Sequence, residues 1–371
     1  RNPNADVIIK SWQVEEEVFT PFVMANFDTM WGNTIVTGNF GVQYVDTDQS
    51  STALAASGTG DNVETVLNAG GDSYSEWLPS ANVTFQFMND SFVRFAYGRT
   101  LARPRMDDLR ASLEWGYNSD NEDSTDINRS PWGGSGGNPA LRPWIADAFD
   151  LSFEKYFLDG LSYVAVAAFY KDLDSWVINL PQPFDFTGYP CGDCNPVLNQ
   201  GLVTTPQNGE GGEISGFELS GAINLGAFTD SWWGGFGAIA SASFTDSSVE
   251  TEPGNEISVP GLSEDVYSLT LYYETERWSA RVNGRYRSDF LGEVSGFGNG
   301  REFRTVEEET VVDAQLSYFF GGKLTGLNLL FQGLNLTDEE FVTFSNGDTR
   351  QVIDYQRYGR TYLLGLAYIW D

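Results

Sequence analysis

The sequence predicts an all-β protein whose strands form a transmembrane antiparallel β-barrel. Strand-like segments alternate in polarity with period 2, many run for about ten residues or more, and short turns and long loops join them alternately. A strand needs about 9 to 11 tilted residues to cross a bilayer core, whereas globular strands usually have about five or six. Tight turns on the periplasmic side and long loops outside are typical of an outer-membrane barrel.

The alternation is clearest between residues 279 and 289. One face carries Ala280, Val282, Gly284 and Tyr286, and the other carries Arg281, Asn283, Arg285, Arg287 and Asp289. Residues 146–157 and 267–274 follow the same pattern, and aromatic side chains such as Tyr362 and Trp370 lie near segment ends, as at a membrane boundary. A soluble β-sandwich would also alternate, so it stays an alternative, although the segment length favours the barrel.

We expect thirteen strand segments, arranged mostly as hairpins. The pairs are 18–31 with 35–49, 72–88 with 91–103, 146–157 with 161–175, 211–226 with 232–248, 262–275 with 277–290, and 308–320 with 324–334, and segment 359–370 closes the chain. Turn residues separate the partners, as at Gly32-Asn33, Asn89-Asp90 and Gly321-Gly322, and Asp159-Gly160 is a type I′-like hairpin signal. Glu276-Arg277 joins its pair tightly.

The long connections between the pairs are 50–71, 104–145, 176–210, 249–261, 291–307 and 335–358. We expect them to be loops without periodicity on the external side of one barrel domain that spans residues 1–371. Bacterial single-chain barrels have even strand numbers. Thirteen segments therefore predict that an earlier strand is missing. The first residues, Arg1-Asn-Pro-Asn, do not resemble a signal peptide, so we expect a removed leader or a longer polypeptide.

Composition excludes several classes of function. The 371 residues include 21 Lys plus Arg and 52 Asp plus Glu, which gives a net charge of −31 and excludes nucleic acid as a partner. There is no histidine, so Ser-His triads, histidine bases and histidine-ligated metals are excluded. No phosphate loop, nucleophile elbow or metal motif occurs. Many carboxylates are present, but nothing places two of them at a glycosidase spacing. We therefore expect no enzyme and no cofactor.

Seven short motifs, in order along almost the whole chain, resemble the C-terminal half of a TonB-dependent outer-membrane receptor. The subgroup they resemble is typified by Caulobacter and Xanthomonas proteins. The motifs are Phe92 to Pro104 with Asp107-Asp-Leu-Arg110, Gly137-Asn-Pro-Ala-Leu-Arg-Pro143, Ala168 to Asp174, Gly212 to Glu218, Val259 to Ser263, Tyr286 to Phe290, and Gly333 to Asp338. By themselves, Arg103-Pro104 and Pro139 to Pro143 indicate loop entry and exit points.

The resemblance implies a 22-stranded barrel in the bacterial outer membrane, plugged by an N-terminal domain, with this chain supplying strands ten to twenty-two. It implies import of a scarce nutrient, often a carbohydrate in this subgroup, driven by the TonB-ExbB-ExbD system through the plug. Neither the plug nor the early strands are in this chain, so coupling residues cannot be assigned to it. Outer-membrane lipid is a further implied partner, and whether a surface lipoprotein also binds stays open. A passive porin and a secreted β-sandwich lectin or glycosidase are the alternative functions.

Aromatic residues crowd the two longest connections. They are Trp115, Tyr117, Trp132, Trp144, Trp176, Phe184, Phe186 and Tyr189. Flat rings can stack on sugar rings, so we treat these residues as candidate substrate contacts. The alternative is that the rings build small cores inside the loops or lie at the membrane boundary. Arg285, with Arg281 and Arg287 on the predicted inner face, could meet an anionic substrate or the plug, or could pair with neighbouring carboxylates.

Cys191 and Cys194 are the two cysteines of the chain. A redox pair or half a zinc site would fit the spacing, but no second cysteine pair or histidine completes a zinc shell. We favour a short disulfide in an external loop of an oxidising compartment. The acidic run Ser119 to Asp126 could gather a structural Ca²⁺, although its spacing is not that of an EF-hand and a solvated acidic loop is favoured.

Overall fold

The computed structural model describes residues 4–157, 160–252, 255–295 and 301–370. Almost every regular element is a strand. The strands are β1 (Trp12–Phe19), β2 (Phe22–Trp31), β3 (Thr34–Ser57), β4 (Glu64–Phe87), β5 (Ser91–Ala102), β6 (Leu113–Tyr117), β7 (Trp132–Gly136), β8 (Trp144–Phe157), β9 (Ser162–Leu173), β10 (Val177–Asp185), β11 (Gln200–Asn208), β12 (Gly212–Asn224), β13 (Phe236–Glu252), β14 (Asn255–Ile257), β15 (Asp265–Glu274), β16 (Trp278–Arg287), β17 (Phe290–Ser295), β18 (Arg301–Val306), β19 (Glu309–Phe319), β20 (Leu327–Leu334), β21 (Glu340–Phe344), β22 (Val352–Arg357) and β23 (Thr361–Tyr368). The helix α1 (Ala5–Ile8) is one turn long, and no helix of the described residues could cross a membrane.

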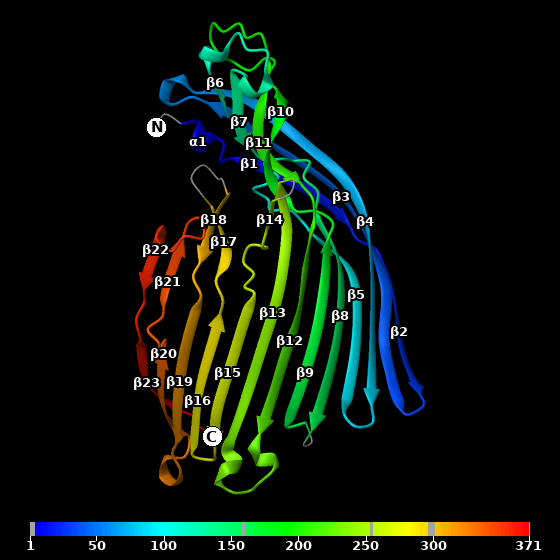
Figure 1. Ribbon diagram of the computed structural model, residues 1–371, viewed down its shortest axis with the longest axis vertical. Helices are drawn as coiled ribbons and strands as arrows, with labels where there is room; N and C mark the ends of the chain where they lie inside the picture. The colour runs from blue at the N-terminus through cyan, green and yellow to red at the C-terminus, as the bar shows by residue number, and fades with distance from the viewer. Residues whose placement is uncertain (1–3, 158–159, 253–254, 296–300, 371) are drawn as a thin grey trace.

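Antiparallel pairing connects the long strands into one curved wall (Figure 1). In order, the wall contains β2, β3, β4, β5, β8, β9, β12, β13, β15, β16, β19, β20 and β23. Each predicted segment overlaps one of these strands, so the prediction of an all-β, antiparallel wall is confirmed. The strand number of a complete barrel stays a prediction, and the Asp159-Gly160 turn lies partly outside the described residues.

One edge of the wall is a single strand interrupted by a proline. β1 and β2 both pair with β3, and the register continues without a shift from Phe19 opposite Asp46 to Phe22 opposite Gln43. Pro21 lies in the gap, where it lacks an N–H but still accepts a hydrogen bond from the Tyr44 N–H at 2.9 Å. Proline is tolerated at a sheet edge because no inner ladder is broken. Within the described ranges, β1 and β2 pair only with β3, and β23 pairs only with β20.

Each of the predicted loops contains strands, which corrects the expectation of unpatterned connections. The region 50–71 continues the β3–β4 hairpin, 104–145 contains β6 and β7, and 176–210 contains β10 and β11. The other three contain β14, the β17–β18 hairpin and the β21–β22 hairpin. β10 was missed because Pro181 and Pro183 argue against a strand, yet both lie on its exposed side while alternate residues are half-buried.

An external crown rises above the wall. We define it as the tip of the β3–β4 hairpin together with β6, β7, β10 and β11. Toward the crown, the pairing of β4 with β5 ends at Ser80 and Gly98. β3 and β4 stay paired beyond this point, up to Ser57 and Glu64. β7 lies parallel to β11, and β6 makes one bridge to β3. In Figure 1 these strands gather at the end of the molecule opposite the short turns.

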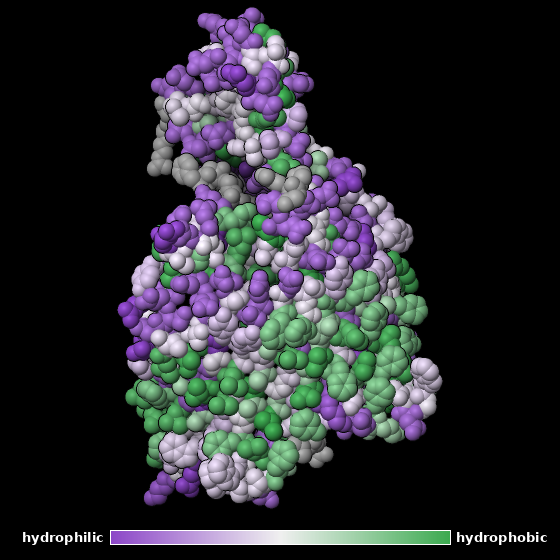
Figure 2. All heavy atoms as spheres, in the orientation of Figure 1, coloured by the Kyte–Doolittle hydropathy of each residue, from purple (hydrophilic) through white to green (hydrophobic). Residues whose placement is uncertain are grey.

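Apolar side chains on one face of the wall stay aligned from strand to strand. This belt includes Leu151, Ala168 and Phe217 on β8, β9 and β12, Leu271, Val282 and Ala314 on β15, β16 and β19, and Leu316, Phe331 and Leu364 on β19, β20 and β23. Leu151 and Leu271 are each 53% exposed and Leu364 is 75% exposed. Figure 2 shows hydrophobic residues gathered over the lower wall and a largely hydrophilic crown. Such a large exposed apolar area indicates contact with lipid.

Tyrosines border the belt on its crown side. The four are Tyr97, Tyr170, Tyr267 and Tyr286, whose hydroxyls donate to Asp147, Glu213, Asp265 and Glu308 at 2.8, 3.2, 2.9 and 2.9 Å. Each ring thus lies beside the belt with its polar end toward a carboxylate, as expected at a boundary between hydrocarbon and water. The opposite face of the wall is polar, with contacts such as Asn82 Nδ2 to Asn39 Oδ1 at 3.1 Å and Asn283 Nδ2 to Thr270 Oγ1 at 2.8 Å.

Candidate functional site

The aromatic residues predicted from the long connections form a core inside the crown. Trp115 and Trp132 are each 4% exposed and Phe186 is 1% exposed. Trp132 stacks on Phe186 with ring centroids 5.1 Å apart, and Trp115 meets Tyr189 edge to face at 5.0 Å. These faces are occupied by one another, so Trp115 and Trp132 hold the crown together instead of offering open surfaces.

Two other predicted tryptophans lie at the base of the crown. Trp144 and Trp176 stack at 5.0 Å with an interplanar angle of 13°. Trp176 is buried and belongs to a separate apolar cluster with Val249 and Val259. This pair therefore joins the start of β8 to the segment that precedes β10.

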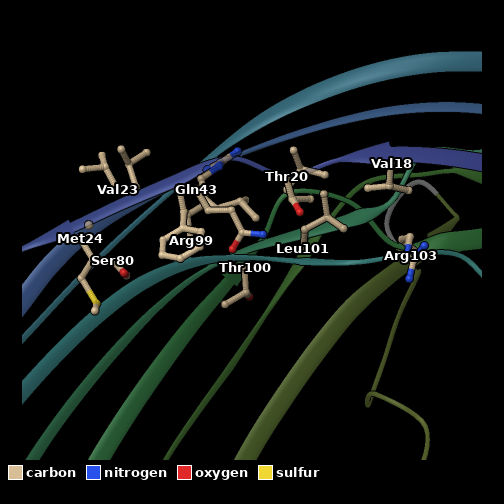
Figure 3. A pocket seen from close by; sticks show the side chains of 15 residues that line it. Val18, Thr20, Val23, Met24, Gln43, Ser80, Arg99, Thr100, Leu101 and Arg103 are labelled. Atoms are coloured by element: carbon tan, nitrogen blue, oxygen red, sulfur yellow. The ribbon is translucent and has the colours of Figure 1, made fainter.

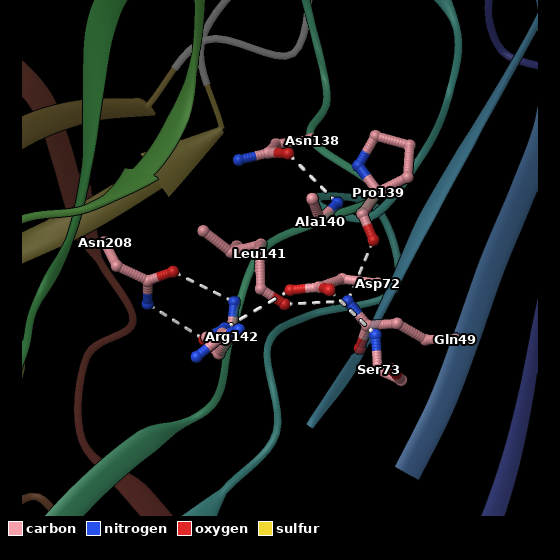
Figure 4. Close-up of polar contacts among 9 residues, drawn as sticks. All are labelled: Gln49, Asp72, Ser73, Asn138, Pro139, Ala140, Leu141, Arg142 and Asn208. Atoms are coloured by element: carbon pink, nitrogen blue, oxygen red, sulfur yellow. Dashed lines mark hydrogen bonds and ion pairs between the residues drawn. The ribbon is translucent and has the colours of Figure 1, made fainter. Parts of the chain in front are cut away.

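The Gly137 to Pro143 motif clamps several elements together (Figure 4). Gln49 is a buried residue of β3, and its Nε2 donates to the carbonyl oxygens of Pro139 and Leu141 at 2.8 Å each. The backbone N–H and carbonyl of Arg142 bond the Asn208 amide of β11 at 2.9 Å each, and its guanidinium pairs with Asp72 of β4 at 3.2 Å. The motif predicted as a loop exit thus also fastens the crown to β3, β4 and β11.

A pocket of about 240 Å³ opens beside this clamp, and we call it the crown pocket. Its lining includes no charged side chain. The polar lining side chains are Asn68, Ser112, Asn138, Thr205 and Gln207, and Phe184 is the one aromatic ring among them. A small uncharged pocket that combines amides, hydroxyls and one ring suits a neutral ligand rich in hydroxyl groups.

Hydrogen bonds within the crown orient the pocket amides. Asn68 Nδ2 donates to Ala111 O at 2.8 Å, Asn138 Nδ2 donates to Pro206 O at 2.9 Å, and Gln207 Nε2 donates to Thr205 Oγ1 at 2.8 Å. Among the described residues, the side-chain oxygens of Asn68 and Gln207 accept no hydrogen bond from another group. These fixed acceptors are available to a ligand without reorganisation of the site.

Three predicted rings, Phe184, Tyr117 and Tyr189, are only partly buried at the margin of the aromatic core. Phe184 lines the pocket and meets Phe186 at 4.9 Å and Tyr189 at 5.8 Å. Tyr117 lies at the margin of the aromatic core and donates to Glu122 at 3.1 Å. Burial raises the pKa of the Tyr189 hydroxyl above its ordinary value.

The predicted arginines line the polar face of the wall. Arg281 lies 3.9 Å from Glu274, and the Arg287 guanidinium lies 3.6 Å from the ring centre of Phe290. Arg285 is exposed on the same face and has no ion pair within the described ranges. The structure does not bring Arg285 together with the crown pocket.

A larger cleft of about 670 Å³ lies at the open edge of the wall, where β4 separates from β5 (Figure 3). Its lining mixes apolar residues such as Val23 and Met24 with Arg99 and Arg103. Arg103 pairs with Glu16 at 3.2 Å, and Arg99 pairs with Asp147 and Asp174. The cationic groups of this cleft are therefore already neutralised, and it is a weaker candidate for ligand binding than the crown pocket.

Cys191 and Cys194 form a disulfide, with Cys191 packed at the margin of the aromatic core. The acidic run uses its side chains for local turns, since Asn118 Oδ1 accepts from the Asp120 N–H and Asp126 Oδ1 accepts from the Asn128 N–H. In the part of the chain that the structure describes, no group of three or more Asp, Glu or Cys residues could hold a metal ion. The Ca²⁺ prediction therefore has no support from this geometry.

Comparison with known proteins identifies one family model and several solved structures. The model described as "TonB dependent receptor-like, beta-barrel" matches residues 2–336. The siderophore receptor PiuA from Acinetobacter baumannii has a TM-score of 0.62 and 14% identity over 96% of this chain and 44% of its own. The ferric-catecholate import receptor Fiu from E. coli K12 has 0.59 and 16% over 96% and 45%. The ferric citrate transporter FecA has 0.53 and 14% over 96% and 55%.

These likenesses, at 14% to 16% identity, concern the fold. The chain spans about half the length of the solved receptors that it matches. No curated protein matches it. The sequence motifs do not point to Asn68, Thr205 or Gln207, because these residues come from two strands, β4 and β11, that are far apart in the sequence. Asn138 lies in the Gly137 to Pro143 motif.

Proposed function

Because the chain belongs to the TonB-dependent receptor-like β-barrel family, we propose that it forms part of the wall and the external binding face of a receptor that imports a scarce nutrient. The family consists of outer-membrane transport proteins, not enzymes. Membership makes the secreted β-sandwich alternative wrong and favours a gated receptor over a passive porin. From the sequence motifs we also propose that the chain belongs to the subgroup typified by Caulobacter and Xanthomonas proteins.

The partners follow from the same premise. The open edges at β2 and β23 are sites where further wall strands would pair, and a plug inside the completed barrel would couple transport to the TonB-ExbB-ExbD system. A surface lipoprotein would meet the crown, since the crown is the part that projects from the membrane. Arg285 faces the interior of the wall, where we propose that it contacts the ligand or the plug during passage.

The ligand class that we propose is a neutral oligosaccharide. The uncharged crown pocket is the observation that carries this proposal, because its amides, hydroxyls and Phe184 match the hydroxyls and apolar face of a sugar ring. The net charge of −31 opposes the approach of anionic complexes. The solved relatives are siderophore, ferric-catecholate and ferric citrate receptors by name, and that ligand chemistry is the competing assignment.

Within this proposal the aromatic residues have two roles. Phe184 contacts the sugar directly, and Tyr117 and Tyr189 extend the contact surface at the margin of the core. Trp115, Trp132 and the Trp144–Trp176 pair support the crown from inside. Substitution of a supporting ring would therefore change stability as well as binding, whereas Phe184 separates the two effects best.

Calorimetric titration of the intact receptor tests the ligand class. One arm uses a panel of neutral hexasaccharides and the other a ferric catecholate siderophore. We expect a hexasaccharide to bind and Phe184→Ala to weaken its binding by about 3- to 10-fold, as for loss of an aromatic contact. Phe228→Ala, an exposed ring at the opposite end of the molecule, is the matched control. Binding of the siderophore and of no hexasaccharide contradicts the ligand class; an unchanged affinity for Phe184→Ala contradicts the crown pocket.

A further inference from the structure

The belt contains a trough along β13. Between the rings of Phe236 and Phe244, the residues of β13 on the belt face are Ala238, Ala240 and Ala242. On β15 the larger side chains of Leu271, Leu269 and Tyr267 flank them, and on β12 Ile223 and Leu219 lie on either side of Gly221, which is opposite Ala240. The three alanines and this glycine leave a depression in the surface that faces lipid.

At the short-turn end this trough deepens into a groove of about 510 Å³, which we call the lipid groove. Its apolar lining side chains are Ile223, Leu225, Trp233, Phe236, Ala238, Leu271, Tyr273, Ala280 and Val282. The one charged lining residue, Arg281, alternates with Ala280 and Val282, so its side chain lies on the opposite face near Glu274. The groove therefore presents hydrocarbon almost exclusively.

An unusual connection builds one wall of the groove. Residues 225–235 join β12 to β13 through two short 3₁₀ turns, Leu225–Ala227 and Trp232–Gly235, and form the large loop at the lower end of Figure 1. Asn224 Oδ1 accepts from the Gly226 N–H at 2.8 Å and fixes the first turn. Trp233 then lies 5.9 Å from Phe236, which lies 4.6 Å from Tyr273. These rings continue the groove beyond the end of the sheet.

We propose that the lipid groove binds one acyl chain of a phospholipid from the periplasmic leaflet, with the phosphate at the level of Arg277. The groove is continuous with the belt that faces hydrocarbon, and it opens at the short-turn side, which is periplasmic in such barrels. The trough from Ala238 to Ala242 is about 14 Å long. This is close to the thickness of one leaflet, which is half of a hydrocarbon core of about 30 Å.

The polar end of the groove carries a positive charge, as the binding of a phosphate group requires. Arg277 lies in the tight β15–β16 turn, next to the strand end that supplies Tyr273 and Ala280 to the groove. Its side chain is exposed and has no ion pair in the described part of the chain. Asp230, in the 225–235 connection, and Glu276, next to Arg277 in the turn, are carboxylates that would suit the ammonium of a zwitterionic headgroup. This proposal rests on the outer-membrane location and is independent of the imported ligand.

Native mass spectrometry of the intact receptor tests the proposal after exchange into detergent with equimolar phosphatidylethanolamine and phosphatidylglycerol. We expect the wild type to retain one phospholipid. Ala238→Phe fills the groove, so the phospholipid occupancy of this variant should be at least about five-fold lower. Ala168→Phe is the matched control, because Ala168 is another belt alanine, between Leu151 and Phe217 on β9. Equal retention by all three proteins, or no retention by the wild type, overturns the proposal.

Two further variants keep the test decisive if Ala238→Phe assembles poorly. Trp233→Ala removes a ring that lies outside the strand ladder, and we expect reduced phospholipid retention from a normally assembled receptor. Arg277→Gln should lower retention about two- to five-fold with either headgroup, while heat resistance of the barrel is unchanged. Retention at the wild-type level in both variants would falsify the groove as the binding site.

Discussion

Gly137 occupies a position in the crown that admits no side chain. A Cβ atom there would overlap the Arg110 carbonyl oxygen and lie 2.8 Å from the Asp108 carbonyl oxygen. Backbone atoms cannot move away as a flexible side chain would, so the close approach explains the glycine physically. The same segment supplies Asn138 to the crown pocket and the two carbonyl oxygens that Gln49 binds.

Gly137→Ala should therefore loosen the crown without affecting the wall. Overpacking of this kind costs about 1 to 3 kcal/mol, which corresponds to about 5- to 150-fold faster protease cleavage through local opening. Limited proteolysis of the intact receptor measures the effect. Gly116→Ala is the control, since a Cβ at Gly116 meets no atom within 4 Å. Equal cleavage rates for the two variants would show that the crown does not depend on this contact.

At the scale of elements, whether a strand could be predicted from the sequence depended on the surroundings that its two faces meet. The wall strands were predictable because one face meets lipid and the other meets water, so alternation survives in the residues themselves. The crown strands were missed because they pack among one another. β7 is glycine-rich and shows no alternation, whereas in β10 Pro181 and Pro183 argue against a strand although its residues alternate. The crown aromatics were found from their density, but their mutual burial depends on pairings between distant hairpins.

The belt on β15 makes a prediction at this scale. Leu269→Arg places a charge among lipid-facing residues, which costs about 2 to 4 kcal/mol near the membrane midplane. We expect markedly less receptor assembled in the outer membrane, measured as heat-modifiable protein in membrane fractions. The neighbour Thr270 faces the polar interior, where its hydroxyl accepts from Asn283. Thr270→Arg should therefore assemble close to the wild-type level, and a loss as large as that of Leu269→Arg would contradict the assignment of faces.

The whole molecule separates binding from membrane contact. The crown carries the uncharged pocket and its aromatic core, the wall carries the belt, and the tyrosines mark the border between them. The lipid groove lies at the other end, near the short turns. Ligand capture and lipid binding are thus expected to respond independently to substitution, because none of the described residues lines both the crown pocket and the lipid groove.

The central claim is that this chain is an outer-membrane wall with one face in lipid. Single spin labels at residues 268 to 271 of the intact receptor in phospholipid vesicles test it most directly, and the two cysteines of this chain, which form a disulfide, do not compete for the label. Accessibility to oxygen and to a water-soluble nickel complex should alternate, with labels at Leu269 and Leu271 accessible to oxygen and labels at Ser268 and Thr270 not. Equal access of the nickel complex to all four positions would contradict the account.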